Sequence, residues 1–374
     1  MPADKIKVMT IFGTRPEIIR LSAVMRKLDE YTNQIIVHTG QNYAYELDGI
    51  FFEELELRKS DYYLEVKSNT LGGQIGNILI KSEEVLLKEK PDALLVLGDT
   101  NSCLSAIIAK RLKIPIFHME AGNRCFDERV PEEINRKIID HISDINLPYT
   151  EHGRRYLILE GIPPGSIYVT GSPLAEVLSY YKEKIDASTI LNTLSLKKGE
   201  YFLISAHREE NVDSKEVFLK LIDSFNALAE KYSKPLLVTT HPRTRNKIKE
   251  YGVEVNALIN LHKPFGYFDY VYLQQNASCV LSDSGTIQEE ASLLNFPAVQ
   301  IRESSERPEA FDTGNVVLSG LDKDIILQAV EIVTGQFLAD KKFEVPRDYQ
   351  SINVSDKVLR LIVGLANIIK KKRK

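Results

Sequence analysis

The chain has 374 residues, a formal net charge of −4, and ordinary fractions of hydrophobic and charged residues, 43% and 27%. One hydrophobic core organises at most about 250–300 residues, so we expect two domains. The acidic balance argues against general nucleic-acid binding, which needs a basic face. An anionic ligand must therefore be met by local arginines.

The cysteines and the apolar runs indicate the cellular compartment of the protein. Cys103, Cys125 and Cys279 form no C-x-x-C pair, and their odd number prevents complete pairing into internal disulfides, which favours a reducing compartment. No signal-like apolar stretch precedes the first expected strand, and no apolar run approaches the roughly 18–20 residues that span a bilayer. We therefore expect a cytoplasmic protein with neither a membrane nor a nucleic-acid partner.

Short strand-like runs alternate with amphipathic segments along the first half of the chain. The expected strands cover residues 7–12, 34–39, 93–97, 114–118, 145–148 and 167–169. This alternation predicts an α/β fold in which helices cover both faces of a parallel sheet. We place this first domain at residues 1–172.

The same alternation restarts in the second half and predicts a second doubly wound domain over residues 173–354. Its strands are expected at residues 201–205, 236–239, 257–261, 279–281 and 298–301. In each half one strand ends in an aspartate that leads into a helix, and open parallel sheets bind ligands at these carboxyl ends. Two such domains facing each other would place the site in the cleft between them.

Residues 355–374 are expected to form a closing helix and a basic tail. An apolar stripe predicts a helix from about residue 355 to 369, long enough to pack back across the domain boundary. The stripe consists of Val358, Leu361, Ile362, Leu365 and Ile368. We interpret the basic end, residues 370–374, as a solvated tail that suits a helix C-terminus.

The turn after the first strand, Gly13-Thr-Arg-Pro-Glu17, joins a glycine to a proline suited to the start of a helix. Arg15 in this turn would bind a diphosphate together with the helix N-terminus. An ordinary strand-to-helix turn with a surface arginine explains the same residues. Arg20, one turn later, has the same two interpretations.

Acidic residues and three arginines crowd the segment from His118 to Arg136, between a strand and a helix. His118 and Glu120 are two residues apart at a strand end, so their side chains point to the same face. Because no third ligand follows at a diagnostic spacing, we interpret the pair as lining a cleft rather than binding zinc.

The helix after this segment has a candidate carboxylate in its first turn. The expected buried stripe consists of Ile134, Ile138, Ile142 and Ile145, which would place Glu132 on roughly the opposite side. Glu132 is then either a functional carboxylate or a favourable charge at the helix N-terminus.

A second cluster, Ser282-Asp-Ser-Gly-Thr-Ile-Gln-Glu-Glu290, opens a helix after an apolar strand. Glu290 borders the expected buried face and is a candidate for binding a ribose hydroxyl, whereas Glu289 is expected to face solvent. A plain capping segment is the alternative. The candidates for holding a phosphate through backbone amides and hydroxyls are Ser284, Gly285 and Thr286.

Two further candidate site residues, a histidine and an arginine, belong to the second domain. His207 follows its first strand at the carboxyl edge, where a functional and a structural role are equally open. Arg307 lies in an irregular loop, either as a phosphate clamp or as a surface residue.

Taken in order, these motifs resemble the non-hydrolysing UDP-N-acetylglucosamine 2-epimerases. The motifs are GTRPE, LGDT, HMEAGNR, PEEINR, a histidine after a strand, SDSG with IQEE, and ERPE. Each alone is modest, but seven in the family's order are specific and cover nearly the whole chain. The resemblance implies two Rossmann-like domains of the B-type glycosyltransferase architecture, usually dimeric, with a UDP-sugar in the cleft.

The resemblance also implies roles for individual residues. Asp99, Glu120 and Glu132 match the acid/base carboxylates, and His207 matches a histidine near the diphosphate. The positions that look like UDP contacts are Arg15, Ser284, Gly285, Glu290 and Arg307, and we add Arg20, Arg124, Arg136 and Thr286 as substrate-binding candidates.

Three departures from the family pattern bear on the substrate. The loop between Glu120 and Glu132 is shorter than usual, Arg20 stands where lysine is frequent, and Thr286 replaces a frequent second glycine. Residues 123–129 resemble the branch acting on 6-deoxy sugars. That branch interconverts UDP-N-acetyl-L-talosamine and UDP-N-acetyl-L-fucosamine for surface polysaccharide synthesis.

A C2 proton beside an acetamido group is too weakly acidic for simple abstraction, whereas elimination of UDP gives a neutral 2-acetamidoglycal to which UDP can return. This route needs acid/base groups and a held UDP, but neither a nicotinamide nor a metal, and the first turn has no G-x-G-x-x-G. Three alternatives stay open: a 2-epimerase for UDP-N-acetylglucosamine and UDP-N-acetylmannosamine, a glycosyltransferase or phosphorylase, and a non-catalytic UDP-sugar sensor.

Overall fold

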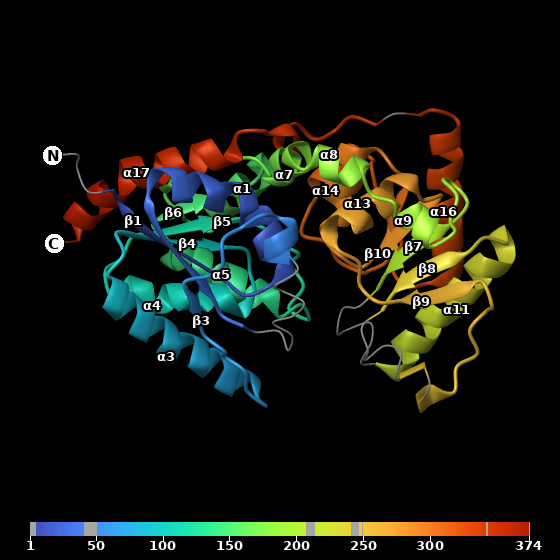
Figure 1. Ribbon diagram of the computed structural model, residues 1–374, viewed down its shortest axis with the longest axis horizontal. Helices are drawn as coiled ribbons and strands as arrows, with labels where there is room; N and C mark the ends of the chain where they lie inside the picture. Colours follow the sequence, from blue (N-terminus) through green and yellow to red (C-terminus); the bar gives the residue numbers. More distant parts are fainter. Residues whose placement is uncertain are drawn as a thin grey trace. The chain divides into compact units, whose positions relative to one another are not determined.

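The structure, a computed structural model, describes residues 5–40, 51–206, 214–240, 247–248, 250–341 and 343–373. The chain forms two compact units (Figure 1). The first unit comprises Met1–Tyr180 and Arg347–Lys374, and the second comprises Tyr181–Pro346. The sequence placed these boundaries at residues 172 and 354 instead, so the first unit gains helix α7 (Leu174–Tyr180) and the short helix η3 (Arg347–Gln350).

The first unit contains a six-stranded parallel sheet in the order β3-β2-β1-β4-β5-β6. Its strands are β1 (Lys7–Phe12), β2 (Asn33–His38), β3 (Tyr62–Tyr63), β4 (Ala93–Leu97), β5 (Ile116–Met119) and β6 (Ile145–Leu147). Its helices before α7 are α1 (Arg15–Tyr31), α3 (Leu71–Glu89), η1 (Asn101–Leu104), α4 (Ser105–Arg111), α5 (Glu132–Ile142), α6 (Glu151–Leu159) and η2 (Pro164–Ser166). The chain winds outward from β1 to β3 and then from β4 to β6, which is the doubly wound pattern.

Buried side chains from alternate strand positions fill the space between this sheet and its helices. Met9, Ile11 and Val96 face a cluster completed by α3, α4 and α5. Helix α1 starts after the extended residue Thr14 with proline in its first turn, where a missing N–H costs no hydrogen bond. Its buried stripe includes Leu21, and the helix packs against β1 and β2.

The closing helix α17 (Val354–Lys372) packs along α1 in the first unit. The expected stripe is partly wrong, because Ile368 is half exposed. The buried positions are instead Val354, Ser355, Val358, Leu359, Ile362 and Ala366. The basic end is not simply solvated either. Lys370 Nζ lies 2.7 Å from Asp92 Oδ1, and Arg373 donates to the carbonyl of Ile114 at 3.0 Å.

The second unit repeats the design with a parallel sheet in the order β12-β11-β10-β7-β8-β9. Its strands are β7 (Phe202–Ser205), β8 (Leu236–Thr239), β9 (Ile259–His262), β10 (Cys279–Ser282), β11 (Ala298–Gln300) and β12 (Val317–Leu318). Its helices are α8 (Lys182–Asp186), α9 (Ile190–Thr193), α11 (Lys215–Tyr232), α13 (Tyr267–Asn276), α14 (Ile287–Leu294), α15 (Glu309–Asp312) and α16 (Lys323–Leu338).

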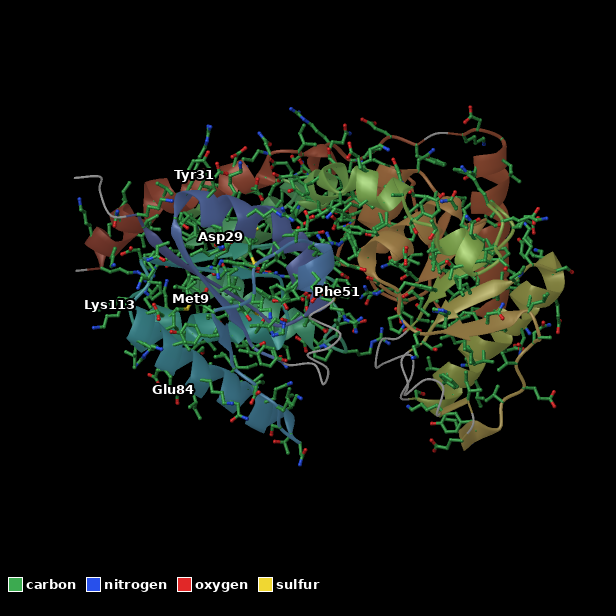
Figure 2. The ribbon with its side chains drawn as sticks, in the orientation of Figure 1. Met9, Asp29, Tyr31, Phe51, Glu84 and Lys113 are labelled. Carbon is green, nitrogen blue, oxygen red and sulfur yellow. The ribbon has the colours of Figure 1, made fainter. Side chains whose placement is uncertain are left out.

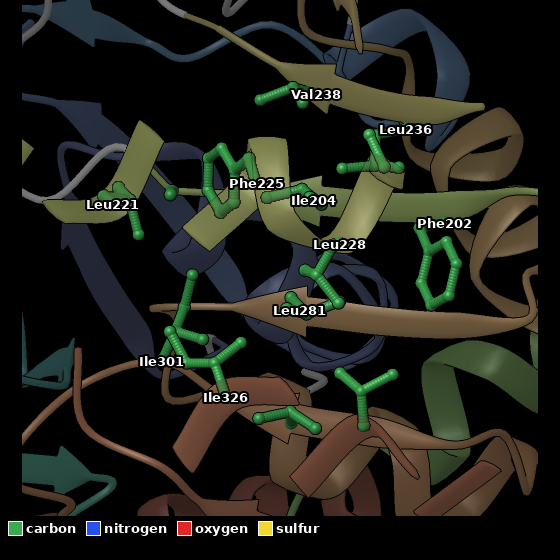
Figure 3. Close-up of a cluster of buried hydrophobic side chains, with 14 of the residues drawn as sticks. Phe202, Ile204, Leu221, Phe225, Leu228, Leu236, Val238, Leu281, Ile301 and Ile326 are labelled. Carbon is green, nitrogen blue, oxygen red and sulfur yellow. The ribbon is translucent and has the colours of Figure 1, made fainter. Parts of the chain in front are cut away.

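Two apolar layers cover the two faces of this second sheet. Phe202 and Ile204 point toward α11 and α16, where Phe225, Leu228 and Ile326 meet them (Figure 3). The intervening positions, such as Leu203, face α9, α13 and α14. Strands buried on both faces explain why the sequence shows continuous apolar runs rather than alternation.

The expected fold class is confirmed, and ten of the expected strands are present with ends shifted by at most two residues. The segment at residues 167–169 is not a strand, since it makes only an isolated bridge between Ile167 and Asn146. Among the described residues, no helix combines the length and the apolar character needed to cross a bilayer.

Candidate functional site

Three neighbouring strands of the first unit end in turns that carry the predicted charged residues. The turn after β1 holds Arg15, the turn after β4 holds Asp99, and Glu120 follows β5. Because β1, β4 and β5 are adjacent and parallel, these three turns share one edge of the sheet. The N-terminus of α5, with Glu132 as its first residue, joins the same edge through its contacts with the Asp99 turn.

Asp99 is fixed by the first turns of α5. Arg136 contacts its Oδ2 with Nε at 2.7 Å and with Nη2 at 2.6 Å, and Asn135 donates to its backbone carbonyl at 2.8 Å. The Asp99 side chain keeps 23% of its surface exposed, whereas that of Arg136 keeps 4%. The arginine therefore lies behind the carboxylate and leaves it accessible.

Glu120 lies beside the Asp99 turn in an unusual backbone conformation. Its φ of +65° is in the left-handed region, which costs a non-glycine residue roughly 1–3 kcal/mol and is frequent at functional sites. Asn123 donates to its Oε1 at 3.2 Å. A Cβ atom on Gly98 would lie 3.6 Å from Oε2 of Glu120, so this carboxylate lies against the residue that precedes Asp99.

His118 does not line an open site, because its side chain is buried with 1% exposure. Its Nδ1 lies 2.9 Å from Oδ1 of Asp140, and its Nε2 lies 2.8 Å from the carbonyl oxygen of Gly98. Both neighbours are acceptors, so the ring bridges α5 to the Asp99 turn. Burial raises the pKa of Asp140, but His118 and Arg124 lower that pKa by more, and the net shift is downward.

The predicted buried face of α5 is wrong at Ile134 and Ile138, whereas Ile142 packs partly buried against the core and Ile145 is buried at the start of β6. Ile134 is 55% exposed and Ile138 is 36% exposed, whereas Glu133, Arg136 and Asp140 are buried. These three polar residues follow an i, i+3, i+7 spacing, which places them on one face of the helix. This spacing was the feature of the sequence that could have predicted a polar buried face. Ion pairs and backbone donors satisfy them, so a polar stripe is the buried one.

Glu133 fastens the loop that connects Glu120 to α5. Its two carboxylate oxygens accept from the backbone N–H groups of Cys125 and Phe126 at 3.1 and 3.2 Å, and Arg136 donates to it at 2.9 Å. Burial raises the pKa of Glu133, but the Cys125 amide and Arg136 lower that pKa more strongly. The sequence reasoning missed this residue because Glu132 beside it carried the motif match.

The remaining predicted cations of the first unit have different surroundings. Arg15 is partly exposed, with its guanidinium 5.7 Å from the Phe51 ring centre, whereas Arg20 is buried over Tyr149. The Arg124 side chain is fully buried between Asp140 and Glu160 and also donates to the carbonyl of Asn123. This burial leaves Arg124 no surface for a substrate contact in this conformation.

In the second unit the predicted phosphate segment connects β10 to α14. The amide of Ser284 donates to the Ser282 hydroxyl at 3.1 Å, and the amide of Thr286 donates to the Ser284 hydroxyl at 3.3 Å. A Cβ atom at Gly285 would lie 2.2 Å from Oε1 of Glu306, so any larger residue would require the Glu306 carboxylate to move. The segment is a compact turn at the carboxyl edge of the second sheet.

Glu289 does not face solvent as expected. It is fully buried and forms an ion pair with Arg307, which is 4% exposed. Glu290 is 8% exposed and accepts from Gln274 Nε2 at 2.6 Å. The helix face was misjudged because a buried ion pair looks like a solvated one in the sequence.

His207 lies outside the described residues, although Ser205 at the end of β7 precedes it closely. Tyr270 on α13 hydrogen-bonds Ser205. Burial, followed by the charge of Glu290, raises the pKa of Tyr270.

Across the described residues, His, Cys, Asp and Glu side chains form no group of three that could hold a metal ion.

Each unit therefore presents a different chemistry at the carboxyl edge of its sheet. The first offers carboxylates held by buried partners, which suits proton transfer, and the second offers a hydroxyl-rich turn with a buried arginine. Two Rossmann-like domains with such edges define an α/β enzyme with a fold like that of the B-type glycosyltransferases.

Comparison with known proteins identifies the family. The family described as UDP-N-acetylglucosamine 2-epimerase matches residues 26–363. The UDP-N-acetylglucosamine 2-epimerase of Methanococcus maripaludis is 41% identical over 334 residues, 87% of this chain and 91% of the relative. The chain thus belongs to the UDP-N-acetylglucosamine 2-epimerase family and is an isomerase, as its motifs predicted.

Solved structures give the same result. The UDP-N-acetylglucosamine 2-epimerase from Rickettsia bellii superimposes with a TM-score of 0.90 at 49% identity, covering 98% of both chains. The enzyme from Methanocaldococcus jannaschii, solved with UDP-GlcNAc and UDP, has a TM-score of 0.89 at 37% identity and covers 96% of this chain and 100% of its own.

Proposed function

We propose that this chain is a UDP-N-acetylhexosamine 2-epimerase that eliminates UDP and adds it back. The observation that carries the proposal is the paired placement of Asp99 and Glu120 at one sheet edge, with Asp99 held from behind by Arg136. Proton transfer to and from C2 needs carboxylates in fixed positions. The structure of the relative solved with UDP-GlcNAc and UDP supports a UDP-sugar as the substrate.

The proposed reaction balances without an added group. One carboxylate among Asp99, Glu120 and Glu132 removes the proton from C2 while the C1–O bond breaks and UDP leaves with the electron pair. The product is a neutral 2-acetamidoglycal. A second of these carboxyl groups then gives its proton to C2 from the opposite face, and the UDP oxygen re-forms the bond to C1.

The second unit and the β1–α1 turn would hold UDP during the lifetime of the glycal. We assign the diphosphate to Arg15, Arg307 and His207, and the ribose to Glu290. Arg20 and Arg136 are buried, so they would favour the bound diphosphate through their positive charge rather than through direct contact. The turn residues Ser284, Gly285 and Thr286 would cradle a phosphate once their hydroxyls turn outward from their present bonds.

The preferred substrate is proposed to be UDP-N-acetyl-L-talosamine, converted to UDP-N-acetyl-L-fucosamine for capsule or O-antigen synthesis in a cytoplasmic homodimer. The short loop at residues 123–129, fastened by Glu133, supports a closed sugar site. The names of the relatives favour UDP-N-acetylglucosamine as the second candidate.

Proton NMR in D₂O tests the proposed function. An epimerase puts deuterium at C2 of the UDP-sugar with no acceptor present, and the second epimer appears. A glycosyltransferase or a UDP-sugar sensor leaves C2 protonated. Absence of deuterium with both candidate sugars would reject the proposal.

A further inference from the structure

Glu17, in the first turn of α1, is a buried carboxylate surrounded by hydrogen-bond donors. It is 2% exposed. Its Oε2 accepts from the Gly13 amide at 3.1 Å, the Thr14 hydroxyl at 2.8 Å and the Thr100 hydroxyl at 3.1 Å. Its Oε1 accepts from the Ser102 hydroxyl at 2.7 Å.

These four donors come from two separate turns of the first unit. Gly13 and Thr14 belong to the β1–α1 turn and directly precede Arg15, whereas Thr100 and Ser102 directly follow Asp99. Neither turn bonds the other through a strand ladder, because both lie beyond the paired residues of β1 and β4. The carboxylate of Glu17 is thus a side-chain bridge between them.

We propose that Glu17 is a positioning residue that holds the Arg15 turn and the Asp99 turn in register at the carboxyl edge of the first sheet. The inference deepens the proposed epimerase function and rests on it, because it assigns the two turns to diphosphate and acid/base chemistry. Glu17 itself touches no reacting atom in this assignment.

The bridge depends on the charge of Glu17. An ionised carboxylate only accepts hydrogen bonds, so it draws the protons of the surrounding amide and hydroxyls toward itself. The Thr100 and Ser102 hydroxyls also lie 2.7 Å from each other, so their two protons are shared among three contacts. A protonated carboxyl must itself donate to one of these hydroxyls, and protonation therefore redistributes the hydrogen bonds that connect the two turns.

The burial of Glu17 brings its protonation into a pH range in which enzyme activity can be measured. Burial raises the pKa of Glu17 from 4.5 to about 7, while the bonds from Ser102, Thr14, Gly13 and Thr100 oppose that rise. The thiol of Cys103 on η1 lies within reach of the charges of Glu17, Asp99 and Asp140. Burial, and then these three carboxylates, raise the pKa of the Cys103 thiol well above its usual value, so this thiol stays neutral across the range.

The first test is the pH profile of C2 deuterium incorporation in the wild type and in Glu17→Gln. We expect wild-type kcat to fall about tenfold per pH unit below about pH 7. In Glu17→Gln, kcat should no longer fall at acid pH, that is, the acid limb of the profile should be absent. Its kcat at the pH-independent plateau should be about 10²-fold lower than that of the wild type, which is the effect of misplacing a catalytic group such as Asp99. Glu84→Gln, an exposed change on α3 (Figure 2), is the matched control and should behave as the wild type. A wild-type plateau and limb in Glu17→Gln would overturn the proposal.

Ser102→Ala provides a second test that keeps Glu17 in place. Because the Ser102 bond lowers the pKa of Glu17, its removal should move the acid limb to higher pH. A purely structural role for Glu17 would leave the position of the limb unchanged. An unmoved limb in Ser102→Ala overturns the proposal even where Glu17→Gln does not fold.

A readout independent of turnover separates this inference from the proposed function. In protein labelled with ¹⁵N-glycine, the amide of Gly13 should titrate with the Glu17 carboxylate, and the amide of Gly98 beside Asp99 should follow with the same midpoint. Both titrations should vanish in Glu17→Gln. If the wild type incorporates no deuterium but both amides titrate, the epimerase proposal fails and the bridge stands. If Gly98 does not follow Gly13, the bridge fails by itself.

Discussion

Arg136 contacts one carboxylate oxygen of Asp99 with two of its nitrogens, Nε at 2.7 Å and Nη2 at 2.6 Å. The same guanidinium donates to Glu133 at 2.9 Å through Nη1. One buried cation thereby orients the partly exposed Asp99 carboxylate and connects it to Glu133, which holds the 123–129 loop. The planar fork is the feature that allows both contacts.

Arg136→Lys tests the importance of that fork. Lysine keeps the charge but offers a single point donor, so Asp99 should lose its fixed orientation. We expect kcat for C2 deuterium exchange to fall by up to about 10²-fold with KM nearly unchanged. Arg154→Lys, at a partly exposed pair with Glu151, is the control and should have wild-type rates. Equal kcat values in the two variants would remove Arg136 from the positioning of Asp99.

The acid/base assignment predicts a common behaviour of three isosteric variants. Asp99→Asn, Glu120→Gln and Glu132→Gln should each bind UDP as the wild type does, because none is assigned to the nucleotide. Turnover should fall by about 10²–10⁴-fold, the usual contribution of a general acid or base. NMR measures the turnover and calorimetry the binding. Near-normal turnover in all three variants would contradict the assignment.

The diphosphate assignment predicts weaker UDP binding in Arg15→Ala, His207→Ala and Arg307→Ala. Charge-assisted hydrogen bonds to phosphate are worth roughly 1.5–3 kcal/mol each, or about 10- to 150-fold in Kd. Calorimetry with UDP measures the change. Thermal melts are needed beside it, because Arg307→Ala also removes the partner of the buried Glu289 and should lower Tm, whereas Arg15→Ala should not. Unchanged affinity in all three would place the diphosphate elsewhere.

Arg124 should behave as a structural cation. Its removal in Arg124→Ala leaves Asp140 buried without this partner, and breaking a buried ion pair typically costs about 3–5 kcal/mol of unfolding free energy. Denaturant titration measures the loss. Arg129→Ala, at an exposed pair with Asp127, is the control and should change stability by less than about 1 kcal/mol. Similar stabilities for the two variants would reject the structural role.

Glu17 should also leave a signature in the pH dependence of stability. Its pKa is raised in the folded state, so between pH 4.5 and about 7 the unfolded chain loses this proton first. Stability from this group therefore falls as pH rises through that window, by about 3 kcal/mol in total. Glu17→Gln carries no such charge, so its stability relative to the wild type should rise by that amount between pH 4.5 and pH 8. A constant difference across the window would contradict the raised pKa.

The sequence predicted the framework well because a parallel sheet buried on both faces produces apolar runs that are hard to mistake. The ends of β1, β4 and β10 followed from those runs, and so did the turns with Arg15, Asp99 and Ser284. Strands β3 and β12 were missed because each has only two paired residues, too few to show a pattern.

Helix faces were the weaker part of the prediction. On α5 and α14 the buried positions include Glu133, Asp140 and Glu289, each satisfied by a partner that lies outside its own helix. Periodicity assigns charged residues to solvent, since it contains no information on such partners. The bridging role of Glu17 was missed for the same reason, because Thr100 and Ser102 are more than 80 residues away along the chain.

The last prediction concerns the sugar. The loop at residues 123–129 connects Glu120 to α5, and its Cys125 and Phe126 amides are fixed on Glu133. Phe126 is 70% exposed and has a φ of +54°, and its ring packs edge-on against Tyr156 of α6 with 5.3 Å between the ring centres.

If this loop closes over C6 of the sugar, a methyl group needs no hydrogen-bond partner there, whereas a 6-hydroxyl would be buried without one. That burial costs about 1–3 kcal/mol, or roughly 5- to 150-fold in kcat/KM. We therefore expect UDP-N-acetyl-L-talosamine to react well and UDP-N-acetylglucosamine poorly. The measurement is kcat/KM for both sugars on the wild type and on a variant whose loop is lengthened by two residues, which should narrow the ratio. Equal efficiency of the native loop on both sugars would reject the 6-deoxy assignment and restore UDP-N-acetylglucosamine as the substrate.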